Sequence, residues 1–217
     1  MRVRIGTYGL LLLLGVLASR VGPALAALSE AAAIVHDLNA TLLDVMKNAE
    51  TLGYAGRRDK IGPAVDRAFD IPFMAEKVIG GHWAKLPEAD RTRWVALFRE
   101  FLVANYAGRF NRYSGQSFED LGEEPSAFDT VMVRTRLVNP ADENVDLNYR
   151  LHKIEPGWRI VDVVLKGTVS ELALRRSDYT AVIDRAGFAA LETYLREKIA
   201  ALEAGKGEPP PGMPAPH

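Results

Sequence analysis

The clearest pattern in the chain is a row of large apolar side chains between residues 87 and 113. The members of this row follow one another in steps of four, closed by one step of three: Trp94, Phe98, Leu102, Tyr106, Phe110 and Tyr113. Positions three and four apart share one face of an α-helix, so the spacing predicts a helix with an aromatic face. That face could be the core stripe of a larger domain or the wall of an apolar ligand cavity, and the helix alone does not decide between them.

Two stretches ahead of this helix show the same helical period. Residues 28–47 and 57–69 carry apolar side chains three and four positions apart, and each stretch predicts a helix. Pro63 is expected in the first turn of the second helix, where proline is tolerated. Asp70 precedes a short apolar segment, and its carboxylate should either cap the free amides of that segment or pair with Arg67.

The period changes from about 3.6 residues to two after position 117. Residues 131–138 and 145–152 alternate between apolar and polar side chains, residues 158–166 form a third candidate strand, and short turns containing proline separate the three. A weaker fourth candidate strand lies at residues 117–123. These strands predict an antiparallel meander with one apolar face, and the aromatic helix is the expected cover of that face.

Helical spacing returns near the end of the domain. Residues 170–186 and 188–202 predict two helices, with Ser170 as a candidate N-cap and Gly187 between them. Gly108 lies inside the aromatic helix, where glycine costs about 1 kcal/mol relative to alanine. This glycine should therefore either admit a close neighbour or mark a bend.

The two ends of the chain differ in composition from the middle. Residues 1–26 combine a basic front, a short apolar run and a small-x-small cleavage pattern, which is typical of a cleaved secretory signal peptide. The run is too short to span a bilayer core of about 30 Å comfortably, which argues against a membrane anchor. Residues 204–217 are rich in proline and glycine and predict a disordered tail. The folded domain is therefore expected at residues 27–203.

The net charge of the chain limits the classes of partner that it is expected to bind. The whole chain has a net charge of −1, and removal of the signal peptide takes away Arg2, Arg4 and Arg20 and no acid, which leaves −4. A mildly acidic chain is a poor match for nucleic acid or for simple adhesion to anionic lipid head groups. There are no cysteines, so the exported chain must be stabilised by a hydrophobic core rather than by disulfides, and its length suits one domain.

The chain shows no catalytic or metal-binding set. Its four histidines have no metal-ligand spacing, and we expect His36, His152 and His217 to be solvated. His82, between Gly81 and Trp83, is a weak signal by itself. Neither a nucleophile elbow nor a phosphate-binding loop is present in the sequence, so we expect no catalytic residue, no metal and no cofactor.

One acid stands out from the surrounding pattern. Asp162 lies inside the apolar strand segment 160–164. It could be a carboxylate at a strand edge, or it could pair with Arg134 or Arg136. Alternatively, an acid beside a tyrosine in a cavity could transfer protons near a steroid-like ligand.

The inventory as a whole favours a carrier of an apolar ligand. Bulky apolar residues are abundant and catalytic groups are missing, and ligand pockets are lined mainly by hydrophobic and aromatic side chains. Burial of a lipid tail is worth about 0.8 kcal/mol per methylene. Two acyl chains could therefore be held without any specific chemistry.

Three long segments carry a family resemblance. Residues 98–120 (FREFLVANYAGRFNRYSGQSFED), 158–172 (WRIVDVVLKGTVSEL) and 183–198 (IDRAGFAALETYLREK) resemble the MlaC family, the toluene-tolerance periplasmic lipid-binding proteins. The resemblance covers the chain from about residue 28 to 203. It implies an α+β, NTF2-like fold in which helices surround a strongly twisted antiparallel sheet of about four strands and enclose an apolar cavity.

The resemblance also implies a function. MlaC proteins are periplasmic binding proteins, not enzymes, and they carry phospholipids between an outer-membrane lipid complex and an inner-membrane ABC transporter. Thr168 matches a position at the cavity mouth, but the segment here reads G-T-V-S instead of G-V-S. This departure resembles the hopanoid-biosynthesis-associated branch, HpnM, for which a polycyclic triterpenoid is the alternative cargo. A more distant alternative is an NTF2-like enzyme that acts on a polycyclic lipid through Asp162.

The candidate lipid-binding residues come from the aromatic helix, the expected apolar face of the sheet and the cavity mouth. Tyr106 matches a cavity-lining position of the family. The full set is Trp94, Phe98, Leu102, Tyr106, Phe110, Val133, Leu147, Tyr149, Val163, Leu165 and Thr168.

Overall fold

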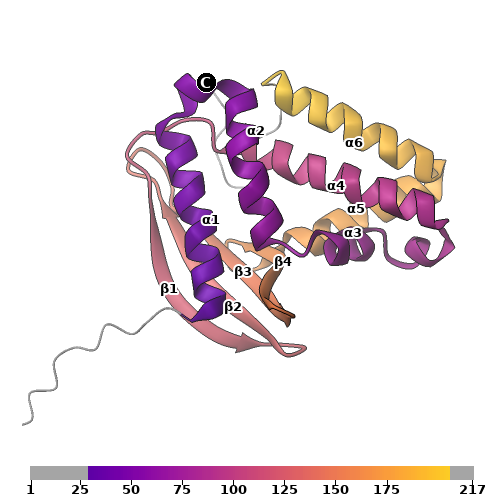
Figure 1. Ribbon diagram of the computed structural model, residues 1–217, viewed down its shortest axis with the longest axis horizontal. Helices are drawn as coiled ribbons and strands as arrows, with labels where there is room; N and C mark the ends of the chain where they lie inside the picture. The colour runs from indigo at the N-terminus through magenta and orange to yellow at the C-terminus, as the bar shows by residue number, and fades with distance from the viewer. Residues whose placement is uncertain (1–28, 206–217) are drawn as a thin grey trace, which may run out of the picture.

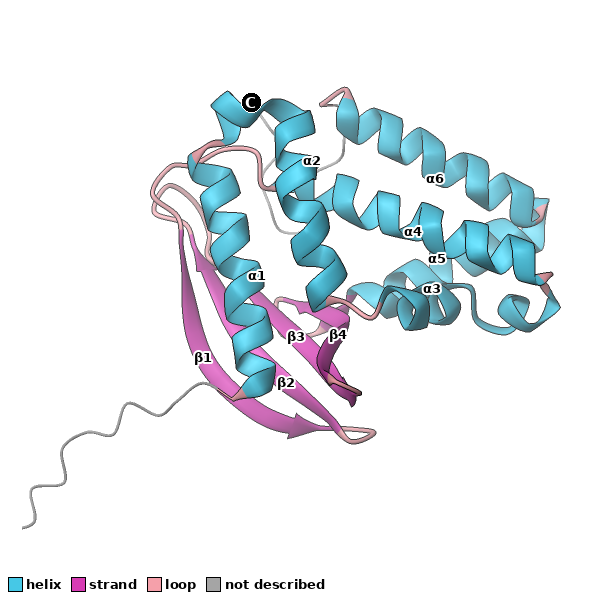
Figure 2. Ribbon diagram, viewed as in Figure 1, coloured by secondary structure: helices cyan, strands magenta, loops and turns pink. Residues whose placement is uncertain are grey.

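The computed structural model describes residues 29–205. The expected signal peptide and nearly all of the expected tail lie outside the described residues, and both stay predictions. The described chain is an α+β domain: α1 and α2 cross one face of a twisted sheet, and α3 to α6 gather beside it (Figures 1 and 2). No helix of residues 29–205 combines the length and the apolar character needed to cross a bilayer.

The first two helices, α1 (Glu30–Lys47) and α2 (Ala49–Ala68), follow one another with a single residue between them. The Ser29 side chain caps α1 by accepting from the Ala32 amide at 3.1 Å. The chain kinks at Gly53, which adopts φ 58°, and the residues on both sides of it are helical, so the first helical turns of α2 lie ahead of the predicted 57–69 segment. Pro63 lies in the interior of α2, not in its first turn, and our prediction of its place was wrong because the helix begins earlier than the apolar period indicates.

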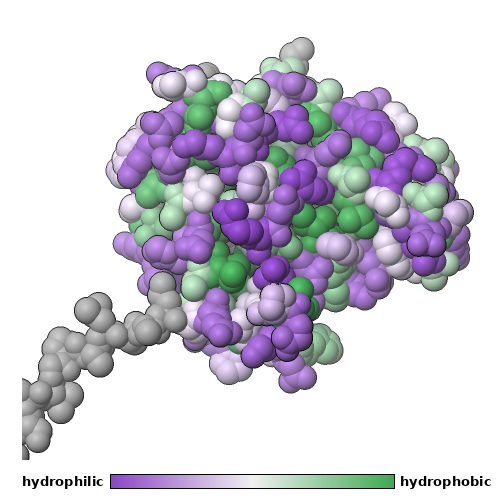
Figure 3. Space-filling view, viewed as in Figure 1, coloured by the Kyte–Doolittle hydropathy of each residue, from purple (hydrophilic) through white to green (hydrophobic). Residues whose placement is uncertain are grey.

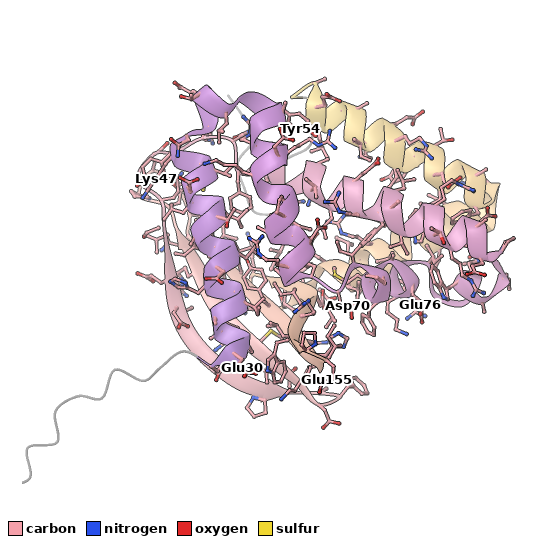
Figure 4. All side chains as sticks on the ribbon, in the orientation of Figure 1. Glu30, Lys47, Tyr54, Asp70, Glu76 and Glu155 are labelled. Atoms are coloured by element: carbon pink, nitrogen blue, oxygen red, sulfur yellow. The ribbon has the colours of Figure 1, made fainter. Side chains whose placement is uncertain are left out.

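The junction between α2 and α3 (Ile71–Ile79) is held by Asp70. Its carboxylate accepts from the Phe73 amide at 3.0 Å, which confirms the predicted cap. The other oxygen lies 2.8 Å from Nε2 of His152, not beside Arg67 (Asp70 is labelled in Figure 4). His152 is therefore not the solvated residue that we expected, because the strand that carries it packs against this junction. A 3-10 helix, Gly80–Lys85, then leads to α4.

The aromatic helix α4 runs over Glu88–Arg109 and ends earlier than predicted. Phe110 is its C-cap residue, and Tyr113 lies beyond it with 43% of its surface exposed, so Tyr113 is not part of the buried row. Gly108 lies against a close neighbour, which confirms the first of the two alternatives that we expected for it. An added Cβ there would lie 2.9 Å from Leu202 Cδ2 of α6 (Phe188–Glu203).

The sheet is a meander of five antiparallel strands in sequence order. The weak candidate at 117–123 is a full strand, and a two-residue strand brings the number above the four expected. The strands are β1 (Ser117–Ser126), β2 (Thr130–Val138), β3 (Val145–Ile154), β4 (Gly157–Leu165) and β5 (Val169–Ser170). Their register places Val133, Tyr149 and Val163 opposite one another on β2, β3 and β4.

The last two helices close the domain as predicted. The Ser170 hydroxyl accepts from the Ala173 amide at 3.0 Å and caps α5 (Glu171–Ala186). Gly187, at φ 84°, makes the turn into α6.

The aromatic helix is not the close cover of the sheet. Helices α1 and α2 lie against the strands, and α3 and α5 reach β4, whereas α4 packs mainly on α2, α3 and α6 (Figure 2). Our expectation that α4 covers the sheet was wrong, because the period of apolar residues identifies the apolar face of each element but not the element against which that face packs. The space between the C-terminal half of α4 and strands β3 and β4 is where a pocket lies.

Candidate functional site: a pocket between α4 and the sheet

A pocket that opens to solvent lies between the second half of α4 and the sheet, and its lining is mainly apolar. Its walls come from the α2–α3 junction, the second half of α4, strands β3 and β4, and the first turns of α5. The lining residues are Phe69, Met74, Leu102, Asn105, Tyr106, Arg109, Phe110, Val145, Leu147, Tyr149, Val163, Leu165, Glu171, Leu172 and Arg175.

The sheet side of the pocket is apolar because of strand alternation. Leu147 and Tyr149 are two residues apart on β3, and Val163 and Leu165 are two apart on β4, so each pair points to the same face. The register sets Leu147 opposite Leu165 and Tyr149 opposite Val163. The four side chains therefore form one continuous apolar wall.

The α4 side of the pocket is aromatic. The rings of Tyr106 and Phe110 stack with centroids 5.7 Å apart and an interplanar angle of 9°. Phe69 meets Tyr106 at 5.7 Å in a tilted arrangement. Burial raises the pKa of the Tyr106 phenol above its usual range, so this phenol stays neutral at physiological pH. It presents ring surface and a hydroxyl, not a charge.

Tyr149 combines a buried ring with a satisfied hydroxyl. Only 1% of its surface is exposed, and its hydroxyl donates to Asn39 Oδ1 of α1 at 3.1 Å. Burial raises its pKa as well, so it is also neutral. The bond to Asn39 fixes the ring as part of the wall.

Three charged side chains interrupt the apolar lining. Arg175 Nη2 lies 2.7 Å from Glu171 Oε2, one helical turn earlier on α5, and both side chains are largely buried. The Arg175 guanidinium also lies over the Phe101 ring, 5.0 Å from its centroid. Arg109 comes from the last turn of α4, and burial, with repulsion from Arg175, lowers its pKa to about 10. At neutral pH the pocket therefore contains two cations and one anion.

Seven of the eleven predicted residues lie in the pocket wall, and the structure gathers them from α4, β3 and β4: Leu102, Tyr106, Phe110, Leu147, Tyr149, Val163 and Leu165. The other four lie elsewhere. Trp94 and Phe98 are buried among the helices at the other half of α4, and Val133 is buried in β2 outside the pocket. Thr168 is exposed in the turn between β4 and β5.

Sequence reasoning missed the polar residues of the pocket. Asn105 and Arg109 flank Tyr106 on α4, and Glu171 and Arg175 are spaced four apart on α5. The signal was available in part, since an i,i+4 acid–base pair in the first turns of a helix is recognisable. What could not be read was that Arg109 and Arg175, sixty-six positions apart in the chain, would face one pocket.

Asp162 belongs to the fold and not to the pocket wall. It is 3% exposed, its Oδ2 accepts from the Ser170 hydroxyl at 2.7 Å, and its Oδ1 accepts from the Leu172 amide at 3.0 Å. It pairs with neither Arg134 nor Arg136. In the sheet, Asp162 pairs with Arg150 of β3 on one side, whereas β5 pairs only with Val164 and Leu165, so the carboxylate lies at an open edge of β4, which is one of the expected alternatives. Both oxygens hold the N-terminus of α5, and the carboxylate does not line the pocket.

The described residues contain no group of three or more His, Asp or Glu side chains arranged to hold a metal ion.

On the face shown in Figure 3, hydrophilic side chains predominate and green areas are small and separate.

Fold and pocket together define an α+β domain with a mainly apolar pocket between a helix and an antiparallel sheet. The family model described as MlaC protein matches residues 36–197, and the chain belongs to the MlaC family. A phospholipid-binding protein from Ralstonia solanacearum, solved in complex with a phospholipid, has a similar fold. It is 24% identical, the match covers 80% of this chain and 99% of that chain, and the TM-score is 0.67.

Proposed function

We propose that this protein is a lipid carrier that buries the hydrocarbon of a membrane lipid in the pocket between α4 and the sheet. The observation that carries the proposal is the continuous apolar wall that β3 and β4 present opposite the Tyr106 ring of α4, in a member of the MlaC family. The similarly folded Ralstonia solanacearum protein was solved with a phospholipid, which supports a lipid as the ligand.

Burial of lipid hydrocarbon in such a site is favourable without any specific polar contact. About ten buried methylenes would contribute about 8 kcal/mol of transfer free energy. The cost of association removes several kcal/mol of this. What remains suits a carrier, which must hold its cargo in water and still release it at a membrane.

The finer proposal concerns cargo and route. We infer that the cargo is a phospholipid and that the protein carries it between an outer-membrane complex and an inner-membrane ABC transporter. Family membership supports this route, because MlaC proteins are periplasmic. The secretory pattern of residues 1–26 is in keeping with it. We propose a binding protein and not an enzyme, since both oxygens of Asp162 serve the cap of α5.

Extraction of the native cargo tests the proposal. The full chain, exported and purified from the periplasm without detergent, should release lipid into organic solvent, and mass spectrometry should identify it at a near-stoichiometric amount. A phospholipid supports the finer proposal, whereas a hopanoid replaces it with the alternative cargo. A protein that carries no lipid, and that binds none after delipidation, would overturn the function.

A blocked pocket provides the matched variant. Val163→Phe places a ring in the pocket, and Val133→Phe adds the same ring to the buried β2 position opposite Tyr149, outside the pocket. We expect the first variant to lose at least about tenfold in lipid affinity, equivalent to about 1.4 kcal/mol, and the second to keep it as long as it folds.

A further inference from the structure

The turn between β1 and β2 carries the most exposed large apolar residue of the described chain. Phe128 is 92% exposed, whereas Tyr113, Val169 and Leu174, the other exposed large apolar residues in that part of the chain, are 38–43% exposed. The turn projects at the lower edge of the ribbon in Figure 2. Single apolar residues are common on protein surfaces. Exposure by itself therefore does not identify an interaction site, and the backbone and charges of the turn have to be considered with it.

The backbone of this turn is well defined and does not favour phenylalanine. Ser126 pairs with Thr130, so three residues connect the two strands, and the Thr130 hydroxyl donates to the Ala127 carbonyl at 2.6 Å. Phe128 and Asp129 have φ angles of 60° and 54°. Glycine, asparagine and aspartate are common in this region, and bulky side chains are rare. Asp129 suits the turn, but the fold does not explain the ring at position 128.

The hairpin that carries the ring is negatively charged. Residues 114–133 contain five acids and neither lysine nor arginine. Within the described residues only one of the five acids has an ion-pair partner, Glu124, whose Oε2 lies 3.9 Å from Nη1 of Arg134. β1 is also an edge strand of the sheet. The hairpin is therefore an acidic projection with an aromatic side chain at its tip. The five acids are Glu119, Asp120, Glu123, Glu124 and Asp129.

The charge distinguishes between a membrane and a protein as the surface that receives this ring. Segments that bind anionic bilayers combine apolar side chains with lysine or arginine, and an anionic lipid surface would repel the acids of this hairpin. A protein pocket with a basic rim would match both features. Buried aromatic side chains supply much of the affinity of protein interfaces, and opposite charges around them steer association.

We propose that the β1–β2 hairpin docks on another protein, with Phe128 inserted into an apolar pocket and with lysine or arginine around that pocket facing the acids of residues 119–129. The inference goes beyond the proposed function. It does not depend on the cargo, because neither Phe128 nor Asp129 lines the pocket between α4 and the sheet.

Photo-crosslinking in the host tests the docking site. The full chain is expressed with p-benzoylphenylalanine in place of Phe128, which keeps an aromatic ring at the tip and reacts on illumination with what it contacts. We expect an adduct with another protein, and mass spectrometry should place the crosslinked peptide beside lysine or arginine residues. The matched control is the same replacement of Tyr113, an exposed aromatic residue that precedes β1 at its other end and should not form this adduct.

Charge reversal makes the test specific. Asp129→Lys, combined with the photoreactive residue at position 128, should lower the yield of the adduct at least about fivefold, because it places a cation opposite a basic rim. Asp142→Lys makes the same change in the exposed turn at the opposite end of β2 and should leave the yield unchanged. In a separate variant, Phe128→Ser should keep the lipid content and the urea midpoint of the wild type, since the exposed ring is part of neither pocket nor core.

Each other outcome overturns the docking proposal. A lipid adduct at position 128 would assign the ring to a membrane, and an adduct with a second copy of this chain would assign it to self-association. The absence of any adduct, or an adduct whose yield ignores Asp129→Lys, would also reject it. Loss of lipid in Phe128→Ser would assign the ring to the cargo site. A protein that forms the expected adduct but carries and binds no lipid would instead overturn the carrier function and support the docking site.

Discussion

The two halves of α4 carry the same row of rings, but they face different neighbours. In the first half, Trp94 donates from Nε1 to the Ala75 carbonyl at 2.8 Å and meets the rings of Tyr179 and Phe188 edge-on, at 6.0 and 5.6 Å. In the second half, Tyr106 and Phe110 stack on each other and face the pocket. The rings of the first half are part of a filled core between helices, and the rings of the second half line the pocket.

The difference shows that the spacing of an aromatic row does not determine whether its side chains form filled core or line a pocket. Helices α3 and α6 pack on α4, and the side chains of Tyr179 and Phe188 fill the space around Trp94 in its first half. The second half lies opposite β3 and β4, which α4 does not approach closely. A straight helix and a twisted sheet diverge along their lengths, so space remains where nothing else enters.

The largest expected contrast lies between two phenylalanines of the row. Phe98→Ala should lower the free energy of unfolding by about 3–5 kcal/mol, because it opens a cavity in a filled core. Phe110→Ala should cost about 2 kcal/mol, because part of its ring already faces the pocket and fewer contacts are lost. Urea unfolding of the delipidated variants measures both values. Equal costs would break the comparison.

The second contrast uses added volume in place of lost volume. Val133→Phe should cost about 1–3 kcal/mol, since a filled core must distort to accept a ring. Val163→Phe should cost less than about 1 kcal/mol, because the ring can enter the pocket. The same urea titrations decide this. If the two variants lost stability equally, the pocket would not be real space.

The third prediction concerns the unpaired charge of the pocket half. Burial, with repulsion from Arg175, lowers the pKa of Arg109 from its ordinary value to about 10, so above pH 10 the unfolded chain binds more protons than the folded chain. Charged Arg109 thus destabilises the ligand-free protein below pH 10. Arg109→Met should raise the unfolding free energy at pH 7 by about 1–2 kcal/mol, part of the gain being offset by lost interaction with the helix C-terminus.

The control for this prediction is Arg176→Met, which should change stability by less than about 0.5 kcal/mol because the side chain is exposed. The advantage of Arg109→Met should shrink as the pH rises above 10, because the wild-type guanidinium then loses its charge in the folded state. A destabilised Arg109→Met protein at pH 7 would contradict the argument.

The smallest expected effect concerns Asp162, a buried polar group that serves the fold. Asp162→Asn should cost about 1 kcal/mol, because it weakens the cap of α5 and removes a negative charge from the helix N-terminus. Lipid content after purification should be unchanged. Loss of lipid without loss of stability would show that Asp162 acts on the ligand.

Local pattern was enough to predict most elements and their order. The caps at Asp70 and Ser170 were readable, since a short polar side chain before an apolar period has few other uses. The length of β1 was underestimated, because its polar, exposed side chains lack the alternation of a half-buried strand. The end of α4 was overestimated, because Tyr113 keeps the helical spacing after the helix has stopped.

The sequence by itself determined the α+β class, the meander, and which side chains of α4, β3 and β4 share an apolar face. Only the tertiary structure decided that Trp94 and Phe98 lie in solid core while Tyr106 and Phe110 line a space. It also brought Arg109 and Arg175 together from two helices. The physical reason is that period fixes which face of an element is apolar, whereas the empty volume between elements depends on how closely they approach one another in space.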